Sequence, residues 1–312
     1  MNICFFASSN SIHSLKWIKY FSGLGYKITW ISLDKRSVEI PDNIEYHELT
    51  NNILFSIFKM KNILSGIKPD ILHVHYLGTY ALLALFSGVK NIVSTPWGSD
   101  IIYGKKHFIK KQIVSKILNK SKLITCDAYH MKDEILDLKI PENKIQIINF
   151  GIDTKRFTKN EKDKNLLKSL NILEEKTVLS MRNFEEVYDV KTLLFAAKIV
   201  LKEIPNIKFL FLGRGGLEKD LKGLAKKLSI NNSVCFLGHL DNTLLSNLLN
   251  SIDIYVSTSL SDAGIAASTA EAMACEVPVV ITDSGENNRW VQNGVNGFLV
   301  PVSDPAKLAD EL

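Results

Sequence analysis

The stretch 253–283, DIYVSTSLSDAGIAASTAEAMACEVPVVITD, decides how the chain folds. An apolar run, DIYVSTS, leads into a loop of small residues around Gly264, and the run ASTAEAMAC that follows has the composition of a helix. The apolar run VPVVITD comes next, so the order is strand, loop, helix and strand, which is the repeating unit of a parallel sheet. Small residues leave the helix N-terminus accessible, and its backbone N–H groups and dipole attract anions there.

Glu271 stands among these small residues, one to two turns inside the predicted helix. A buried carboxylate that has no partner is strongly destabilising. A pair of sugar hydroxyls, such as a ribose diol, would satisfy it by donating hydrogen bonds. The alternative is that the small residues only allow close packing of helix on sheet and that Glu271 caps an internal group. Spacing alone leaves both interpretations open.

Strand and helix units of the same kind recur along the whole chain. Apolar runs in the first half are NICFFAS, KITWISL, NIEYHEL, DILHVHY, NIVSTPW, KLITCDA and KIQIINF, and those in the second half are TVLSMRN, IKFLFLG, SVCFLG, DIYVSTS and VPVVITD. The segment GIDTKRFTKNEKDKNLLKSLN between the two series is highly charged and has no strand pattern. The sequence therefore predicts an α/β protein with two doubly wound, Rossmann-like parallel-sheet domains, 1–155 and 156–312, that face each other across a cleft.

Composition is that of an ordinary soluble protein, with 46% hydrophobic and 23% charged residues in 312. The four cysteines are scattered without a CxxC pair, which indicates a reducing compartment, and the N-terminus lacks the basic start of a signal peptide. We therefore expect a cytoplasmic protein without a nucleic-acid partner. Residues 71–89 carry no formal charge. A membrane span is one interpretation, and the strand ILHVHY, the turn LGT and the helix YALLALFSG are the interpretation we favour.

A basic segment lies between Asp100 and Asp127, where there are seven lysines and no acid. Ile109, Ile113 and Ile117 recur at helical spacing, so we predict a helix with one apolar and one basic face. The basic face is either simply solvated or, between Lys105 and Lys122, in peripheral contact with an anionic membrane surface on the inner face of the cell membrane. Each lysine near such a surface contributes about 1 kcal/mol.

Several stretches together resemble one enzyme family. The segment STSLSDAGIAASTAEAMACEVPVVITDSGENNRWVQNGVNGFLV resembles the donor-binding signature of the family-4 glycosyltransferases, also called group 1, which are retaining enzymes of the GT-B fold. The stretches HYLGTYALLA, VSTPWGSDI, IINFGIDTKRF and FLGRGGLEKDLKGLAKKLSINNSVCFLGHL match the same family in order.

This resemblance implies an acceptor domain in the first half of the chain and a nucleotide-sugar donor domain in the second. The reaction would be transfer of a sugar from a nucleoside-diphosphate sugar, such as a UDP- or GDP-sugar, to a saccharide or lipid-linked saccharide in surface polysaccharide or glycolipid synthesis. No metal or other cofactor is expected, because no DxD-like cluster of acids appears. Family members continue beyond the final SDPAKLADEL with a helix that returns to the first domain, so we expect a C-terminally shortened chain that lacks its last helices.

The resemblance assigns donor-side roles residue by residue. Glu271 matches the acid that binds the ribose, and Arg182 matches the arginine that holds the diphosphate. The family's other acid would stand at Ala263, and Asp262 is one residue early. The family's lysine is replaced by Val187, with Lys191 as the nearest substitute. The remaining donor-side matches are a glycine turn, the segment that reads the base and the amides that hold phosphate: Gly213, Arg214 and Gly215; Leu237, Gly238 and His239; Gly264, Ile265 and Ala266.

On the acceptor side, the resemblance points to residues in the first domain. His13 stands at the start of the first helix, where the family often has a histidine near the transferred sugar, and its alternative is an ordinary surface position. Trp97 replaces a histidine that the family often has. Asp100 is the preferred acceptor-side acid, and His75 is a better candidate for the cleft than His73, which we assign to the core. The predicted catalytic set is Asp262, Glu271, Arg182 and His13.

Two other classes of function compete with this one. Val187 and the displaced Asp262 are what a catalytically degenerate member, serving as a binding or scaffold protein, would show. A two-domain solute-binding protein also pairs α/β domains, but it would need an export signal, and the N-terminus lacks one.

Overall fold

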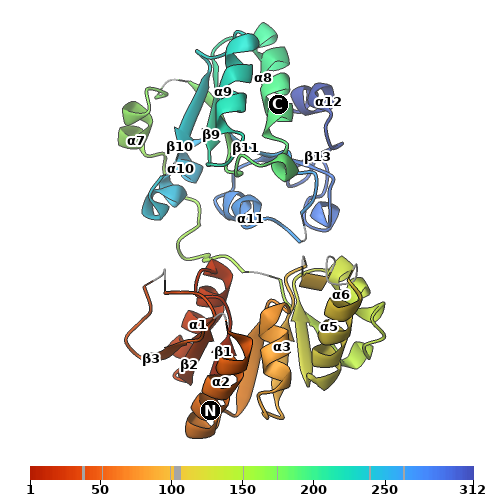
Figure 1. Cartoon of the computed structure of the whole chain (residues 1–312). Helices are drawn as coiled ribbons and strands as arrows, with labels where there is room; N and C mark the ends of the chain where they lie inside the picture. The colour runs from red at the N-terminus through yellow and green to blue at the C-terminus, as the bar shows by residue number, and fades with distance from the viewer. Residues whose placement is uncertain are drawn as a thin grey trace. The chain divides into compact units, whose positions relative to one another are not determined.

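The structure is a computed structural model that describes residues 1–36, 39–50, 52–98, 100–101, 107–149, 151–173, 175–238, 240–262 and 264–312, with backbone only at position 12. The chain divides into two compact units, Met1–Asn149, here the N-unit, and Phe150–Leu312, the C-unit. Each unit has one parallel sheet with helices on both faces (Figure 1). The predicted fold class, two Rossmann-like α/β domains, is therefore confirmed.

The N-unit sheet has the strand order β3-β2-β1-β4-β5-β6-β7, and all its pairs are parallel. All the apolar runs predicted as strands in this half form them. The strands are β1 (Asn2–Phe6), β2 (Lys27–Ser32), β3 (Ile44–Glu48), β4 (Ile71–His75), β5 (Ile92–Thr95), β6 (Leu123–Cys126) and β7 (Ile145–Ile147). The helices are α1 (Ile12–Gly23), α2 (Ile53–Ile67), α3 (Thr79–Leu85), α5 (Phe108–Lys120), α6 (Tyr129–Leu136) and the short 3-10 helix η1 (Glu142–Lys144).

Alternation along β1 shows why this sheet is covered on both faces. Cys4 and Phe6 belong to a core cluster that includes residues of α2, α3 and α5, whereas Ile3 and Phe5 belong to the cluster under α1. Successive side chains of a strand point to opposite faces, so a strand with no polar alternation needs cover on both.

The C-unit sheet has the order β10-β9-β8-β11-β12-β13. Its strands are β8 (Lys176–Ser180), β9 (Ile207–Leu212), β10 (Val234–Gly238), β11 (Ile254–Ser257), β12 (Val279–Thr282) and β13 (Phe298–Val300). Its α-helices are α7 (Lys164–Ser169), α8 (Val190–Glu203), α9 (Glu218–Lys227), α10 (Leu245–Ser251), α11 (Ala267–Ala274) and α12 (Pro305–Asp310), and its 3-10 helices are η2 (Glu186–Tyr188), η3 (Asn242–Leu244) and η4 (Asn287–Arg289). The predicted strands formed, and β13, which has three residues, was not predicted.

Both faces of the C-unit sheet are again covered. Val178 of β8 packs in a cluster with α8, α9 and α12, whereas the next residue, Leu179, packs in a cluster with α7, α10 and α11. The helix α11, within the stretch 253–283, therefore packs on the sheet through small residues. Ala272 is fully buried there.

The structure tests the predictions for the uncharged segment 71–89 and for the basic segment between Asp100 and Asp127. Residues 71–89 form β4 and α3, as favoured. None of the described helices is long and apolar enough to cross a bilayer. In the basic segment, α5 buries Val114, Ile117 and Leu118, but Ile109 is 73% exposed, so its placement on the buried face was wrong. Ile109 lies in the first turn of α5, ahead of the turns that pack on the core.

Candidate active site

The C-unit sheet has one point where the chain reverses its direction of winding. From β8 the chain proceeds to β9 and β10 on one side, and β11, β12 and β13 then lie on the other side of β8. The loops that follow β8 and β11 therefore leave neighbouring strand ends in opposite directions. In open α/β sheets, ligands bind in the crevice that forms at such a switch point.

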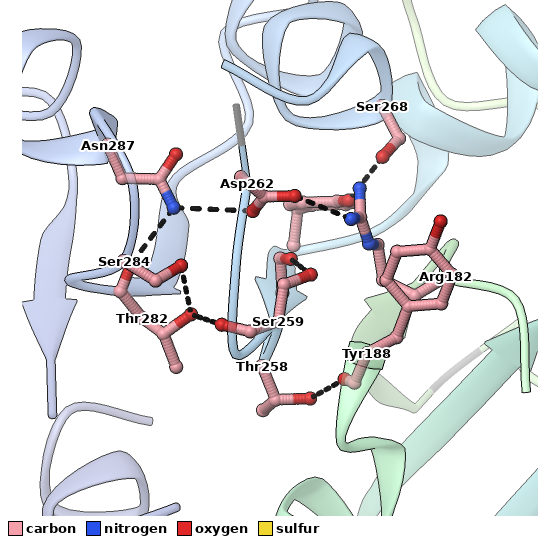
Figure 2. Close-up of polar contacts among 11 residues, drawn as sticks. Arg182, Tyr188, Thr258, Ser259, Asp262, Ser268, Thr282, Ser284 and Asn287 are labelled. Atoms are coloured by element: carbon pink, nitrogen blue, oxygen red, sulfur yellow. Dashed lines mark hydrogen bonds and ion pairs between the residues drawn. The ribbon is translucent and has the colours of Figure 1, made fainter. Parts of the chain in front are cut away.

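Arg182 follows β8 and Asp262 follows β11, and their side chains meet at this switch point (Figure 2). Arg182 Nη2 donates to Asp262 Oδ1 at 2.7 Å, and the two side chains are only 10% and 7% exposed. The Arg182 guanidinium lies over the ring of Tyr188, with Cζ 4.3 Å from the ring centroid. Arg182 Nε is buried and has no hydrogen-bond partner. The arginine is therefore fixed in place with a donor still unused.

The glycine turn after β9 packs directly against the loop after β8. A Cβ on Gly213 would lie 2.4 Å from the Arg182 carbonyl oxygen, and one on Gly215 would lie 2.4 Å from that of Phe184. Phe184 N also donates to Arg214 O at 3.0 Å. Only glycine fits at both positions, because any side chain would push the two backbones apart. The predicted glycine turn thus locks the backbone of Arg182 in position.

The end of β10 closes the same edge of the sheet. Gly213 N donates to Gly238 O at 3.1 Å, and Gly238 adopts a positive φ of 66°. Leu237 is half-buried and Arg214 is exposed. The predicted base-reading segment therefore adjoins the glycine turn. His239 lies outside the described residues.

The helix α11 begins at this edge with a terminus that has no side-chain cap. Its N-cap is Ala266, which offers no hydrogen-bond acceptor, and Gly264, Ile265 and Ala266 are half-buried. Backbone N–H groups of a first turn without a cap are the donors that a phosphate accepts from. Glu271 lies further along α11 and is half-buried, beside the buried Ala272.

The N-unit has its own switch point, between β1 and β4. A cavity of about 420 Å³ lies there, and it is lined by Ser8, Asn10, Ser11, His13, Ser14, His75, Tyr76 and Trp97. His13 and Trp97 meet edge to face, with ring centroids 5.4 Å apart. Ser14 Oγ and His75 Nδ1 are 3.1 Å apart. His75 Nε2 and Trp97 Nε1 are buried without a hydrogen-bond partner.

Both histidines of this cavity are held in the neutral form. Burial lowers the pKa of His13, and nearby Lys16 lowers it further. Burial also lowers the pKa of His75 well below its usual value, with further contributions from His73 and His13. His73 does not line the cavity and bonds to Thr95 Oγ1 at 2.7 Å in the interior. The cavity is therefore aromatic and uncharged along the lining given above.

Asp100 is placed differently from the other acceptor-side candidates. Its carboxylate is buried and accepts the backbone N–H groups of Leu77 at 2.6 Å, Trp97 at 2.9 Å and Ile101 at 3.1 Å. Burial raises the pKa of Asp100, and the backbone hydrogen bonds oppose that rise. Asp100 is not among the residues that line the cavity. It anchors the loop that carries Trp97 to the loop that follows β4, and its predicted contact with an acceptor stays a prediction.

Family models match both halves of the chain. Residues 161–312 match the glycosyl transferases group 1, and residues 2–128 match the glycosyl transferase 4-like family. The chain belongs to the group 1 glycosyltransferases. The resemblance drawn from the sequence is thereby confirmed, and with it the assignment as an enzyme.

This glycosyltransferase is similar over most of its length to two named transferases and to a protein of known structure. It is 29% identical over 313 residues to the N-acetyl-alpha-D-glucosaminyl L-malate synthase of Bacillus anthracis, across 94% of this chain and 80% of that protein. It is 26% identical to the UDP-Gal:alpha-D-GlcNAc-diphosphoundecaprenol alpha-1,3-galactosyltransferase of Escherichia coli, across 80% of this chain and 67% of that one. Anabaena Alr3699/HepE, crystallised with UDP, has the same GT-B fold, with a TM-score of 0.84 at 17% identity over 99% of this chain and 88% of that one.

Most of the residues predicted for this glycosyltransferase gather at the two switch points. Arg182, the glycine turn, Asp262 and the start of α11 lie in the C-unit, and the N-unit cavity takes His13, His75 and Trp97. Lys191, the predicted substitute for the family's lysine, is exposed and lies 3.8 Å from Glu186.

Sequence reasoning missed some residues around Asp262. Tyr188 stacks under Arg182, and Asn287 approaches Asp262 Oδ2 at 3.4 Å. Neither residue carries a motif signal. Their positions depend on which strands are neighbours in the sheet.

Proposed function

We propose that the chain is a retaining glycosyltransferase that moves a hexose from a nucleoside-diphosphate sugar, such as a UDP- or GDP-sugar, to a saccharide or lipid-linked saccharide acceptor. One observation carries the proposal. A nine-tenths buried arginine, Arg182, stands at the switch point of the C-unit sheet, together with an uncapped helix N-terminus and a glycine turn. Arg182 and the helix terminus supply N–H donors to an anion, the glycine turn holds the backbone of Arg182 in place, and a diphosphate matches that arrangement.

The proposed chemistry needs negative charge to be stabilised on the leaving group. When the bond from sugar C1 to the diphosphate breaks, charge develops on the phosphate oxygens. Arg182 and the amides around Gly264, Ile265 and Ala266 would stabilise it, because fixed donors in a partly dry site need no reorganisation. We therefore propose that no metal ion is needed for this step.

We further propose that Glu271 holds the ribose of the donor. Glu271 is half-buried on α11, in the second turn after the uncapped terminus. A diphosphate at the terminus would place the ribose beside this turn, where the carboxylate can accept from both hydroxyls. Support for a UDP-sugar as the donor, though not for this residue's role, comes from the fold neighbour Anabaena Alr3699/HepE, which was also crystallised in complex with UDP-glucose and has a TM-score of 0.81 to this chain.

The acceptor is proposed to bind in the N-unit cavity. Its lining combines rings, among them those of His13, His75 and Trp97, with small polar side chains, and it includes no permanently charged side chain. Sugars bind well to such surfaces, because a ring face packs on aromatic groups while hydroxyls bond to neutral donors. The name of the Escherichia coli relative specifies a lipid-linked sugar as its acceptor. A neutral saccharide fits this lining better than the dicarboxylate malate in the name of the Bacillus anthracis relative.

Retention of anomeric configuration is proposed to proceed without a protein nucleophile. A retaining hydrolase uses two carboxylates about 5 Å apart, one of which attacks the sugar. Asp262 is a poor nucleophile, because one of its oxygens is bonded to Arg182 at 2.7 Å. Attack of the acceptor hydroxyl from the face that the diphosphate leaves would conserve the configuration.

We also propose that the enzyme is cytoplasmic and contacts the inner face of the cell membrane through α5. Phe108 and Ile109 are 77% and 73% exposed at its start, and Lys110 and Lys111 follow directly and are exposed. Apolar residues beside lysines suit an anionic bilayer surface. Sedimentation with vesicles of phosphatidylcholine and phosphatidylglycerol tests this contact. Lys110→Ala with Lys111→Ala should weaken it, whereas the exposed pair Lys226→Ala with Lys227→Ala on α9 should not.

The proposed reaction is tested by incubating the protein with a panel of UDP- and GDP-sugars, with and without saccharide and lipid-linked acceptors. Release of nucleoside diphosphate identifies the donor, and nuclear magnetic resonance of the product gives its anomeric configuration. Glu271→Ala should lose most of the transfer activity while circular dichroism shows an intact fold. Glu203→Ala, which changes an exposed acid of the same unit, is the control. Near-normal turnover of Glu271→Ala would remove the ribose assignment.

A further inference from the structure

We propose that Asp262 is a positioning residue, which fixes Arg182 for the donor diphosphate and does not contact the transferred sugar. The inference rests on the proposed function of the C-unit site as a donor site. It departs from the role that the family resemblance gives to an acid in this loop, and it explains how an acid one residue early in the motif can serve the reaction.

The contact itself is specific and well shielded. Asp262 Oδ1 accepts from Arg182 Nη2 at 2.7 Å, and both side chains are nine-tenths buried or more. Charge-assisted hydrogen bonds of this length are strong, and burial removes the water that would compete for either partner. The carboxylate therefore determines where the guanidinium points.

Asp262 is itself fixed by neighbours on two further sides. Asn287 Nδ2 lies 3.4 Å from Asp262 Oδ2 and also donates to Thr282 O at 2.9 Å (Figure 2). The backbone of Asp262 also packs directly against Gly285. Gly285 has a φ of 57°, and a Cβ there would lie 1.6 Å from the Asp262 carbonyl oxygen. An acid packed so closely cannot swing toward a sugar without first leaving Arg182.

The pair is not needed to keep the two loops together. Leu260 N donates to Val187 O at 2.8 Å. Thr258 Oγ1 donates to Tyr188 O at 3.0 Å, as Figure 2 shows. These bonds already tie the loop after β11 to the loop after β8. What the ion pair adds is the orientation of the guanidinium between Asp262 and the ring of Tyr188.

Arg182 retains hydrogen-bonding capacity for a ligand. A guanidinium has five N–H donors in a planar fork. Arg182 Nε is buried and has no partner, which is unusual for a buried charged group. An anionic oxygen at this edge of the sheet would satisfy it, and the uncapped start of α11 favours an anion at the same edge.

The test measures binding by calorimetry of UDP, GDP and the matching monophosphates UMP and GMP to the full chain. Asp262→Ala should weaken the preferred diphosphate about tenfold, and Arg182→Ala should weaken it more. The double variant should be no weaker than Arg182→Ala, because Asp262 acts only through that residue. Monophosphate affinity should stay within about twofold in Asp262→Ala. Asp310→Ala, which breaks an exposed pair with Lys307, is the control.

Three results would overturn the inference: an unchanged diphosphate affinity with a loss confined to the intact nucleotide sugar, additive losses in the double variant, or tighter diphosphate binding. If Asp262→Ala does not fold, Asp262→Asn takes its place, because it conserves the shape and an oxygen acceptor. Its diphosphate affinity should lie between that of the unsubstituted chain and that of Arg182→Ala. Wild-type diphosphate binding in Asp262→Asn, with failure on the nucleotide sugar alone, also contradicts the inference. If the unsubstituted chain binds neither diphosphate, the proposed function fails, which is a separate result.

Discussion

Gly285→Ala is expected to disable the donor site without altering any residue that is proposed to touch the donor. Gly285 has a φ of 57°, and an added Cβ would lie 1.6 Å from the Asp262 carbonyl oxygen. An ordinary contact begins near 3.4 Å, so the loop that carries Asp262 must retreat by about 1.8 Å. The Asp262–Arg182 bond is 2.7 Å long and leaves the usual hydrogen-bonding range after a shift of only about 0.5 Å.

Gly294→Ala provides the matched control, because Gly294 has a φ of 74° but no atom within 4 Å of an added Cβ. Each variant loses about 1–2 kcal/mol of stability because alanine is strained in left-handed backbone. Gly285→Ala should lose more than Gly294→Ala in urea unfolding, because its added Cβ also meets the Asp262 carbonyl oxygen. Only Gly285→Ala should also lose nucleoside-diphosphate affinity, by about tenfold in calorimetry with UDP or GDP. Equal affinities in the two variants would show that the position of the Asp262 loop does not matter for the diphosphate.

Three further predictions concern charge and protonation. Burial lowers the pKa of His73 to about 3, so the unfolded chain binds a proton that the folded chain does not, and stability is lost as the pH falls below about 6.5. In urea unfolding at about pH 6, 5 and 4, the unfolding free energy should change less with pH in His73→Gln, by about 1.4 kcal/mol per pH unit. An unchanged pH dependence would contradict the lowered pKa of His73. Asp100→Asn should lose about 3 kcal/mol of stability and raise the acceptor KM, because an amide NH₂ would face backbone donors; wild-type unfolding would argue against this. EDTA should leave turnover within about twofold of the untreated enzyme, since Arg182 and the α11 amides are proposed to stabilise the leaving charge, and restoration of a lost activity by Mg²⁺ would refute that.

Much of the fold could be predicted from the sequence, because apolar runs separated by helix patterns identify strands buried on both faces. What spacing cannot give is the extent of each element. The strand β13, of three residues, was not predicted. Ile109 has helical spacing yet lies ahead of the turns of α5 that pack on the core. Periodicity defines which face of a helix is apolar, but not how far its neighbours reach along it.

In the candidate site, too, the sequence predicts individual residues but not the contacts between distant ones. Arg182 and the glycine turn could be found from motif resemblance, yet the partner of Arg182 lies 80 positions further along the chain. That contact depends on β8 and β11 being neighbours, which only the sheet order reveals. Asp100 was recognisable as an acid in a loop. Its three backbone donors include Leu77, 23 positions earlier, so its role as an anchor could not be foreseen.

The geometry of the C-unit site also separates what must stay constant from what can vary. The backbone contacts at Gly213, Gly215 and Gly285 leave room for a hydrogen atom but not for a side chain. These three positions therefore form a fixed backbone frame around Arg182 and Asp262. Val187 and Leu260 are 42% and 43% exposed, and a backbone hydrogen bond of 2.8 Å joins them beside this frame. Substitutions there change the exposed surface of these two loops and leave the glycine contacts intact. If the proposed donor diphosphate binds at this frame, a change of donor sugar is expected to arise at the exposed positions and not at the glycines.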